Sequence, residues 1–109
     1  MTHVALRPLN DGYLFSCEGH AGYAEKGKDI VCAGISALCM ALCARLEDMS
    51  LQGMVHLSQV SASDGELTLR AETESGDKMS ALLLACVFET VMAGLTALEA
   101  DYPDYLIVT

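Results

Sequence analysis

The sequence predicts an α+β fold, a two-layer sandwich in which two long helices cover one face of a mixed sheet. Two long stretches rich in apolar residues have helical spacing, and short segments of strand character surround them in the order ββαββαβ. With 109 residues the chain is long enough for one compact domain with one core and too short for two. We therefore expect a single domain over residues 1–109, with its site inside that domain or between subunits.

The first half of the chain is predicted to form a hairpin, a loop and a helix. Residues 2–7 and 12–18 contain β-branched or aromatic side chains, and the turn-rich segment 8–11 separates them. Residues 19–29 contain three glycines and two lysines without apolar periodicity, which predicts a mobile loop. Residues 30–49 lack proline and carry apolar side chains at helical spacing, so a mostly buried helix follows the loop.

The second half is predicted to repeat this order of strands and helix. Segments 54–60 and 66–72 alternate around the turn-rich segment 61–65, which predicts a second hairpin. A second apolar helix spans residues 77–100 and ends ahead of a proline, because the residue before proline disfavours helical backbone. Residues 105–108 are predicted to form a short final strand.

The charge and composition of the chain limit its partners. Fifteen acidic residues against six basic ones give a formal net charge of -9. Binding to nucleic acid needs clustered Lys and Arg, so direct nucleic-acid contact is not expected, whereas a basic polypeptide is a better partner. Acidity that serves only solubility is an equally good explanation of the charge alone. Hydrophobic residues make up 52% of the chain, so we expect a homodimer that buries excess apolar surface.

The cysteines and the absence of a secretory pattern predict a compartment. Five cysteines are an odd number and none has C-x-x-C spacing: Cys17, Cys32, Cys39, Cys43 and Cys86. We therefore expect reduced thiols and a cytoplasmic location. No apolar run approaches about 20 residues without interruption by polar side chains, so no membrane span is expected.

Cys32 is a candidate nucleophile because it falls in the first turn of the predicted helix. Asp29, directly before that helix, is a good N-cap candidate, since its carboxylate can accept the N–H of Val31 or Cys32. A thiol there faces unpaired backbone N–H groups and the positive end of the helix dipole, which favour thiolate over thiol. By itself the position is weak evidence, because a cysteine in an apolar helix is more often a small core residue.

His20 strengthens the hypothesis because it follows the predicted second strand, in the loop that leads to Cys32. The end of a strand and the start of a helix can meet at one site, where His20 would take the thiol proton and later protonate the leaving amine. A surface-loop histidine is the alternative, and the spacing does not exclude it. Asp29 has two compatible interpretations, the helix cap or a third residue that orients the imidazole. His3 and His56, in predicted strands, are expected to be bystanders.

Polar residues further along the same helix are weaker candidates for the functional site. Ser36 lies one turn after Cys32 and could support the thiol or substrate, but a bond back to the Cys32 carbonyl is the favoured interpretation. Cys39 lies seven residues, about 10 Å, beyond Cys32, too far for both sulfurs to hold one zinc ion with Cys43. We therefore expect Cys39 and Cys43 to pack in the core and expect no metal site.

Residues 19–38, GHAGYAEKGKDIVCAGISAL, resemble the signature of the ribosomal-processing cysteine proteases, the Prp family. Gly19 and His20 match its glycine–histidine pair, residues 29–33 match its nucleophile segment, and Ser36 follows at the family spacing. The ending EADYPDYLIV also resembles the C-terminus of the family, and the similarity extends over essentially the whole chain.

This resemblance implies a dimeric cysteine endopeptidase that removes the N-terminal extension of a bacterial large-subunit ribosomal protein. It implies a catalytic dyad of His20 and Cys32 that works without a cofactor, and a flexible loop that closes over the bound peptide. Because ribosomal proteins are basic, an acidic enzyme would attract such a substrate. The other expected site residues are the supporting Gly19, Asp29 and Ser36 and the loop residues Ala21, Gly22, Tyr23 and Gly27.

Two alternatives from other functional classes stay open on the residues alone. The first is a noncatalytic, ribosome-associated peptide-binding module in which His20 and Cys32 only shape a pocket. The second is a redox- or metal-responsive thiol protein. It ranks last, because a disulfide between Cys39 and Cys43 on one intact helix is sterically poor.

Overall fold

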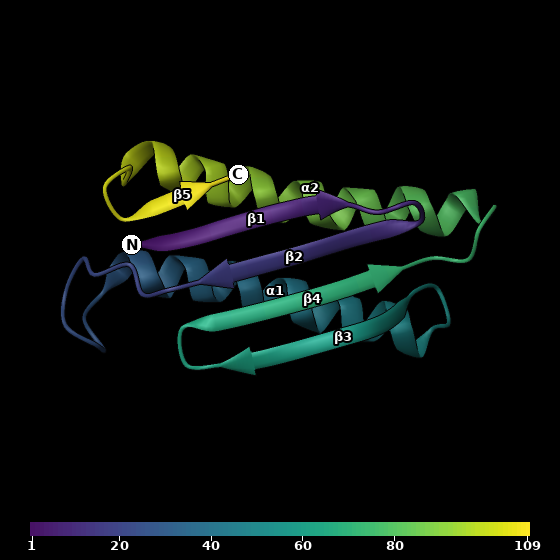
Figure 1. Ribbon diagram of the computed structural model, residues 1–109, viewed down its shortest axis with the longest axis horizontal. Coiled ribbons are helices and arrows are strands. Elements are labelled where there is room, and N and C mark those ends of the chain that lie inside the picture. The colour runs from purple at the N-terminus through teal and green to yellow at the C-terminus, as the bar shows by residue number, and fades with distance from the viewer.

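The computed structural model describes all residues, Met1–Thr109, and has the predicted order of elements (Figure 1). The chain forms two hairpins, each followed by a long helix, and ends in a short strand. The elements are β1 (Thr2–Pro8), β2 (Gly12–Glu18), α1 (Ile30–Leu51), β3 (His56–Ser63), β4 (Glu66–Glu72), α2 (Lys78–Asp101) and β5 (Leu106–Val108). The predicted α+β order ββαββαβ is confirmed.

The five strands form one mixed sheet in the order β3-β4-β2-β1-β5. β2 lies at the centre and pairs antiparallel with both β1 and β4, while β5 adds to β1 in parallel. In the central register Phe15 faces Leu69 and Cys17 faces Leu67. Because β2 is the middle strand and leads directly into the loop, the residues after Glu18 emerge at the centre of one sheet end.

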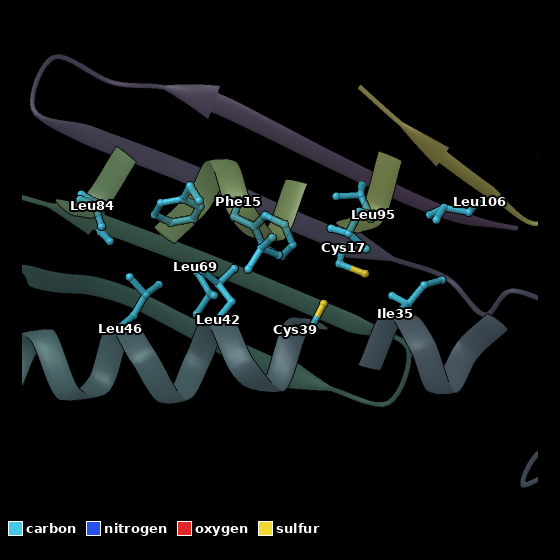
Figure 2. Close-up of a cluster of buried hydrophobic side chains, with 14 of the residues drawn as sticks. Phe15, Cys17, Ile35, Cys39, Leu42, Leu46, Leu69, Leu84, Leu95 and Leu106 are labelled. Carbon is cyan, nitrogen blue, oxygen red and sulfur yellow. The ribbon is translucent and has the colours of Figure 1, made fainter. Parts of the chain in front are cut away.

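The core lies between the sheet and the two helices, which cover the same face (Figure 1). Figure 2 shows side chains from the sheet and from both helices meeting there. The fully buried large side chains include Phe15 and Leu69 from the sheet, Leu42 and Leu46 from α1, and Leu84 and Phe88 from α2. Aromatic contacts join α2 to the sheet, with the Phe88 ring centroid 4.9 Å from that of Tyr13 and 6.5 Å from that of Phe15.

Two glycines set the contact between the helices, which run antiparallel. A Cβ on Gly94 would lie 3.0 Å from a methyl group of Leu38, and a Cβ on Gly34 would lie 3.3 Å from a methyl group of Leu98. Each glycine therefore receives a leucine from the opposite helix. Gly34 lies two residues after Cys32 in α1. Its contact with Leu98 therefore holds the end of the helix that carries Cys32.

The second hairpin differs from its predicted boundaries. β3 begins two residues later than predicted, at His56, and runs three residues further, to Ser63, so the predicted turn 61–65 shrinks to Asp64 and Gly65. Gly65 adopts a φ of +73°, a backbone conformation that glycine reaches without strain. This two-residue turn lets Ser63 pair directly with Glu66. The final strand is also shorter than predicted and begins at Leu106.

Helix α1 is two residues longer than predicted, and α2 has the predicted length but begins and ends one residue later. By length and composition, α1 with 22 residues and α2 with 24 residues could each cross a membrane. Each nevertheless buries one stripe of side chains against the sheet, and core helices of globular proteins share this composition. Their outer faces carry exposed apolar side chains, which the amphipathic pattern alone does not explain.

We expect Leu46→Ala to destabilise the protein by about 2–5 kcal/mol, because it leaves a cavity in the core. Leu46 is fully buried, whereas Val60, on β3, is 55% exposed. Val60→Ala is the control and should change the free energy of unfolding by no more than about 0.5 kcal/mol. Urea denaturation followed by circular dichroism measures both. Equal effects of the two substitutions would contradict this account of the core.

Candidate active site

The loop after β2, the start of α1 and the turn between β3 and β4 lie at the same end of the molecule (Figure 1). A large cavity is lined by residues of all three and continues along α1. Its volume is about 1050 Å³, and His20 and Cys32 both line it. The structure therefore brings together the strand-end histidine and the helix-start cysteine that the sequence singled out. Gly19, Asp29 and Ser36 lie in the same wall.

The cavity is elongated because it follows one face of α1. Cavity-lining residues recur along the helix from its first turn to Glu47. At 1.5 Å per residue, Cys32 and Glu47 lie about 22 Å apart along the helix axis. An extended peptide rises about 3.3 Å per residue, so this length accommodates six or seven residues, on the order of a protease subsite row.

Asp29 fixes the start of α1 and the end of the loop with one carboxylate. Its Oδ1 accepts the backbone N–H of Cys32 at 2.9 Å, which makes Asp29 the N-cap of α1. Its Oδ2 accepts the N–H groups of Tyr23 at 2.9 Å and Ala24 at 3.3 Å. The same side chain therefore folds the loop back onto the helix and holds the backbone of Cys32.

The pKa of the Asp29 carboxyl is lowered by these contacts. Desolvation raises it, but the N–H groups of Cys32, Ala24, Tyr23 and Val31 together outweigh that effect and hold the pKa below its usual value. A carboxyl whose folded-state pKa is lowered stabilises the fold above its unfolded-state pKa. That stabilisation is lost as the pH falls through the folded-state pKa. The start of α1 is therefore expected to loosen at strongly acidic pH.

Backbone contacts hold His20 at the end of β2. The Met1 ammonium group donates to the His20 carbonyl at 2.7 Å, and the Gly19 N–H donates to the Gly65 carbonyl, also at 2.7 Å. Gly19 has a φ of +90°, and a Cβ there would lie 2.5 Å from the Met1 carbonyl oxygen. Only glycine fits this position, so the backbone geometry requires a glycine directly before His20.

A model of the family described as cysteine protease Prp matches residues 1–107. This chain belongs to the Prp cysteine protease family. It is therefore a cysteine protease, a hydrolase. The chain is 31% identical to the ribosomal processing cysteine protease Prp of Bacillus subtilis (strain 168), over all of this chain and 96% of that protein.

Solved structures share the fold over the whole chain. The Prp ribosomal processing protease of S. aureus has been solved with a covalently linked product peptide and with a substrate peptide. Those structures match with TM-scores of 0.76 and 0.70 at 20% and 19% identity, over all of this chain and 98% of theirs. A Streptococcus mutans protein matches with a TM-score of 0.65 at 25% identity, over all of this chain and 92% of that one.

Three other thiols line the cavity together with Cys32, those of Cys17, Cys39 and Cys43. The contact between the Cys39 and Cys17 thiols, together with burial, raises the pKa of Cys39 far above its usual value, and the same contact lowers the pKa of Cys17. Burial also raises the pKa of Cys43. Figure 2 shows Cys17 and Cys39 reaching into the core from β2 and α1. The predicted core packing of Cys39 and Cys43 is confirmed, and neither is poised as a thiolate.

The sequence analysis did not predict the contact between Cys17 and Cys39. Cys17 and Cys39 lie 22 residues apart, on a strand and a helix, and nothing in their spacing marks them as a pair.

The predicted hydrogen bond from the Ser36 hydroxyl to the Cys32 carbonyl was wrong, since the Ser36 hydroxyl makes no such contact. Thr90 does form that kind of bond, to the Cys86 carbonyl at 2.7 Å. Ser36 is exposed and lines the cavity instead.

The four loop residues proposed to contact substrate divide into two pairs. Gly22 and Gly27 line the cavity. Ala21 is only 2% exposed and belongs to the core. The Tyr23 ring lies edge-on against the rings of Tyr102 and Tyr105, with centroids 5.6 and 5.2 Å away. In this structure Tyr23 contacts the end of α2 and the segment after it, is 42% exposed, and does not line the cavity.

The sequence also missed the carboxylate beside His20. Both oxygens of Asp29 bind backbone N–H groups, so the structure does not place Asp29 as the residue that orients the imidazole. Asp64, in the β3–β4 turn, lies nearest to that ring, with its Oδ2 3.9 Å from Nε2 of His20. Asp64 is 44 residues away in sequence, and only the pairing of β2 with β4 brings it to the cavity.

We expect Asp29→Ala to lower the melting temperature and to speed hydrogen exchange at the N–H groups of Tyr23, Ala24 and Cys32, because these donors lose their acceptor. The matched control is Asp77→Ala, since Asp77 caps α2 in the same way through the Ser80 N–H, at 3.1 Å. The control should also lower the melting temperature but leave exchange in the loop unchanged. Unchanged exchange in Asp29→Ala would contradict the assigned contacts.

Proposed function

We propose that the chain acts as one cysteine-protease domain over residues 1–109 that removes the N-terminal extension of a bacterial large-subunit ribosomal protein. The observation that carries the proposal is that His20 and Cys32 line one cavity long enough for an extended peptide. Membership of the Prp family supports an endopeptidase over a noncatalytic peptide-binding module. The ribosomal processing role named for the Bacillus subtilis relative supports this class of substrate.

In the proposed mechanism His20 takes the proton of the Cys32 thiol, and the thiolate attacks the scissile carbonyl carbon. The carbon–nitrogen bond then breaks as His20 returns the proton to the leaving amine. Water hydrolyses the thioester with His20 as base and restores the thiol. Asp29 already binds the N–H groups of Cys32 and Ala33, so the proposed stabilisation of the oxyanion comes from the positive end of the helix dipole and from backbone N–H groups of the loop.

The charge of the protein suits a basic peptide. The formal net charge is -9, and four carboxylates line the cavity against two lysines: Asp29, Glu47, Asp64 and Glu66 against Lys26 and Lys28. A negative cleft raises the local concentration of a cationic peptide. We propose that loop 19–29 closes over the bound peptide, with Gly22 and Gly27 at the cavity wall as its flexible points. A reducing cytoplasmic location follows, because the nucleophile must stay a free thiol.

We expect Cys32→Ala and Cys32→Ser to bind a synthetic peptide that spans the extension and its cleavage site, with little cleavage above background, because the nucleophile is lost. His20→Ala should lower kcat about 10²- to 10⁴-fold, the usual range for loss of a general base. Mass spectrometry follows cleavage, and fluorescence polarisation measures binding.

Cys86→Ala is the matched control, since Cys86 is exposed and lies outside the cavity. It should cleave at the rate of the native enzyme. Native cleavage by Cys32→Ala would overturn the assignment of the nucleophile, and native kcat in His20→Ala would overturn the assignment of the base.

We also propose that the protein is a homodimer formed through the outer faces of the two helices. Large apolar side chains are exposed there: Leu51 on α1, and Met79, Leu82 and Leu83 on α2. A second copy would cover this surface with matching apolar side chains, and no lipid is required. The length and apolar composition of the helices, which would suit a membrane span, then have another explanation. Each helix buries one side against the sheet and the other side against the partner.

We expect Leu82→Asp to shift the protein from a dimer towards the 11.6 kDa monomer, because a charge would be buried in the interface. Val60→Asp is the control, since Val60 is a similarly exposed apolar residue on β3, in the opposite layer. Sedimentation equilibrium measures the mass of each variant. A monomeric native protein at micromolar concentration would contradict the proposed dimer, as would equal dissociation in both variants.

A further inference from the structure

The imidazole of His20 rests on the turn between β3 and β4. A Cβ built on Gly65 would lie 2.7 Å from Nε2, 3.0 Å from Cε1 and 3.2 Å from Cδ2 of that ring. The ring would therefore have to move from this position if residue 65 carried a Cβ. The Gly19 N–H bond to the Gly65 carbonyl joins the backbone beside His20 to the same turn.

A negative charge accompanies this contact. Oδ2 of Asp64 lies 3.9 Å from Nε2 of His20, and Nζ of Lys26 lies 3.9 Å from the same oxygen. The distance to His20 is too long for a hydrogen bond, so the contact is electrostatic and the packing on Gly65 sets the position of the ring. A carboxylate there favours the imidazolium that forms when the thiol proton is transferred. The effect strengthens when a bound peptide excludes water.

We propose that Gly65 and Asp64 form a seat for His20, which makes Asp64 a positioning residue for peptide cleavage. The seat holds one orientation of the imidazole on the cavity wall before substrate arrives. Fewer side-chain torsions then have to be ordered in the transition state. This inference rests on the proposed role of His20 as the general base and extends the site to the second hairpin, which carries no residue of the signature around Cys32.

The first test compares two glycines with equal backbone strain. Gly65 and Gly53 have φ values of +73° and +74°, but a Cβ on Gly53 meets nothing within 4 Å. Gly65→Ala and Gly53→Ala should therefore lower the melting temperature by similar amounts, while only Gly65→Ala displaces the ring. We expect kcat for peptide cleavage to fall about 10- to 100-fold in Gly65→Ala and to stay native in Gly53→Ala.

The second test removes the negative charge of Asp64. Asp64→Asn should lower kcat about 3- to 10-fold, as expected for one partly screened charge contact. Asp64→Glu should restore kcat because the longer side chain keeps the carboxylate near Nε2. Asp104→Asn is the matched control, since Asp104 is an exposed carboxylate outside the cavity, and it should leave kcat unchanged. Native kcat in Asp64→Asn, or an equal loss in Asp104→Asn, would overturn the positioning role.

A readout that needs no catalysis separates the seat from the proposed function. The imidazole resonances of His20, assigned in NMR spectra by comparison with His20→Ala, should shift in Gly65→Ala and Asp64→Asn. They should not shift in Gly53→Ala. Unchanged His20 resonances in both seat variants would overturn the seat even if the native enzyme cleaves its peptide. A native enzyme that leaves the peptide uncleaved while those resonances shift would instead count against the proposed substrate.

Discussion

The position of the active site depends on where α1 begins, and the carboxylate of Asp29 decides this. It accepts the Cys32 N–H with one oxygen and two loop N–H groups with the other. A helix cap usually satisfies one orphan donor, whereas this one also closes the loop that follows β2. Because the loop starts directly after His20, the same carboxylate limits how far the histidine and the cysteine can separate.

Three thiols on α1 line the cavity, and burial differs among them. Cys32, the proposed nucleophile, lies in the first turn, at the positive end of the helix dipole. Cys39, two turns later, is buried against Cys17, and this contact and burial raise its pKa, while burial raises the pKa of Cys43. Cys39 and Cys43 therefore stay protonated, which leaves the start of the helix as the proposed place of the chemistry.

The helices carry more apolar surface than one sheet can cover. Each buries a single stripe, and large side chains on the outer faces stay in contact with solvent. This surplus explains both the membrane-like composition of the helices and the proposed second copy. The glycine contacts between α1 and α2 bring the helices close together, so their outer faces form one continuous surface instead of two separate ridges.

The sequence by itself determined the order of the elements and the cap at Asp29, and it singled out His20 and Cys32, which line one cavity. These depend on local signals: period, turn residues, a cap before an apolar run and a compact motif. Only the tertiary structure decided that Tyr23 turns away from the cavity and that Cys39 pairs with Cys17. It also decided that Asp64 and Gly65 lie beside His20. Those contacts join residues far apart in the chain, and the strand register that brings them together is set by the packing of the whole core.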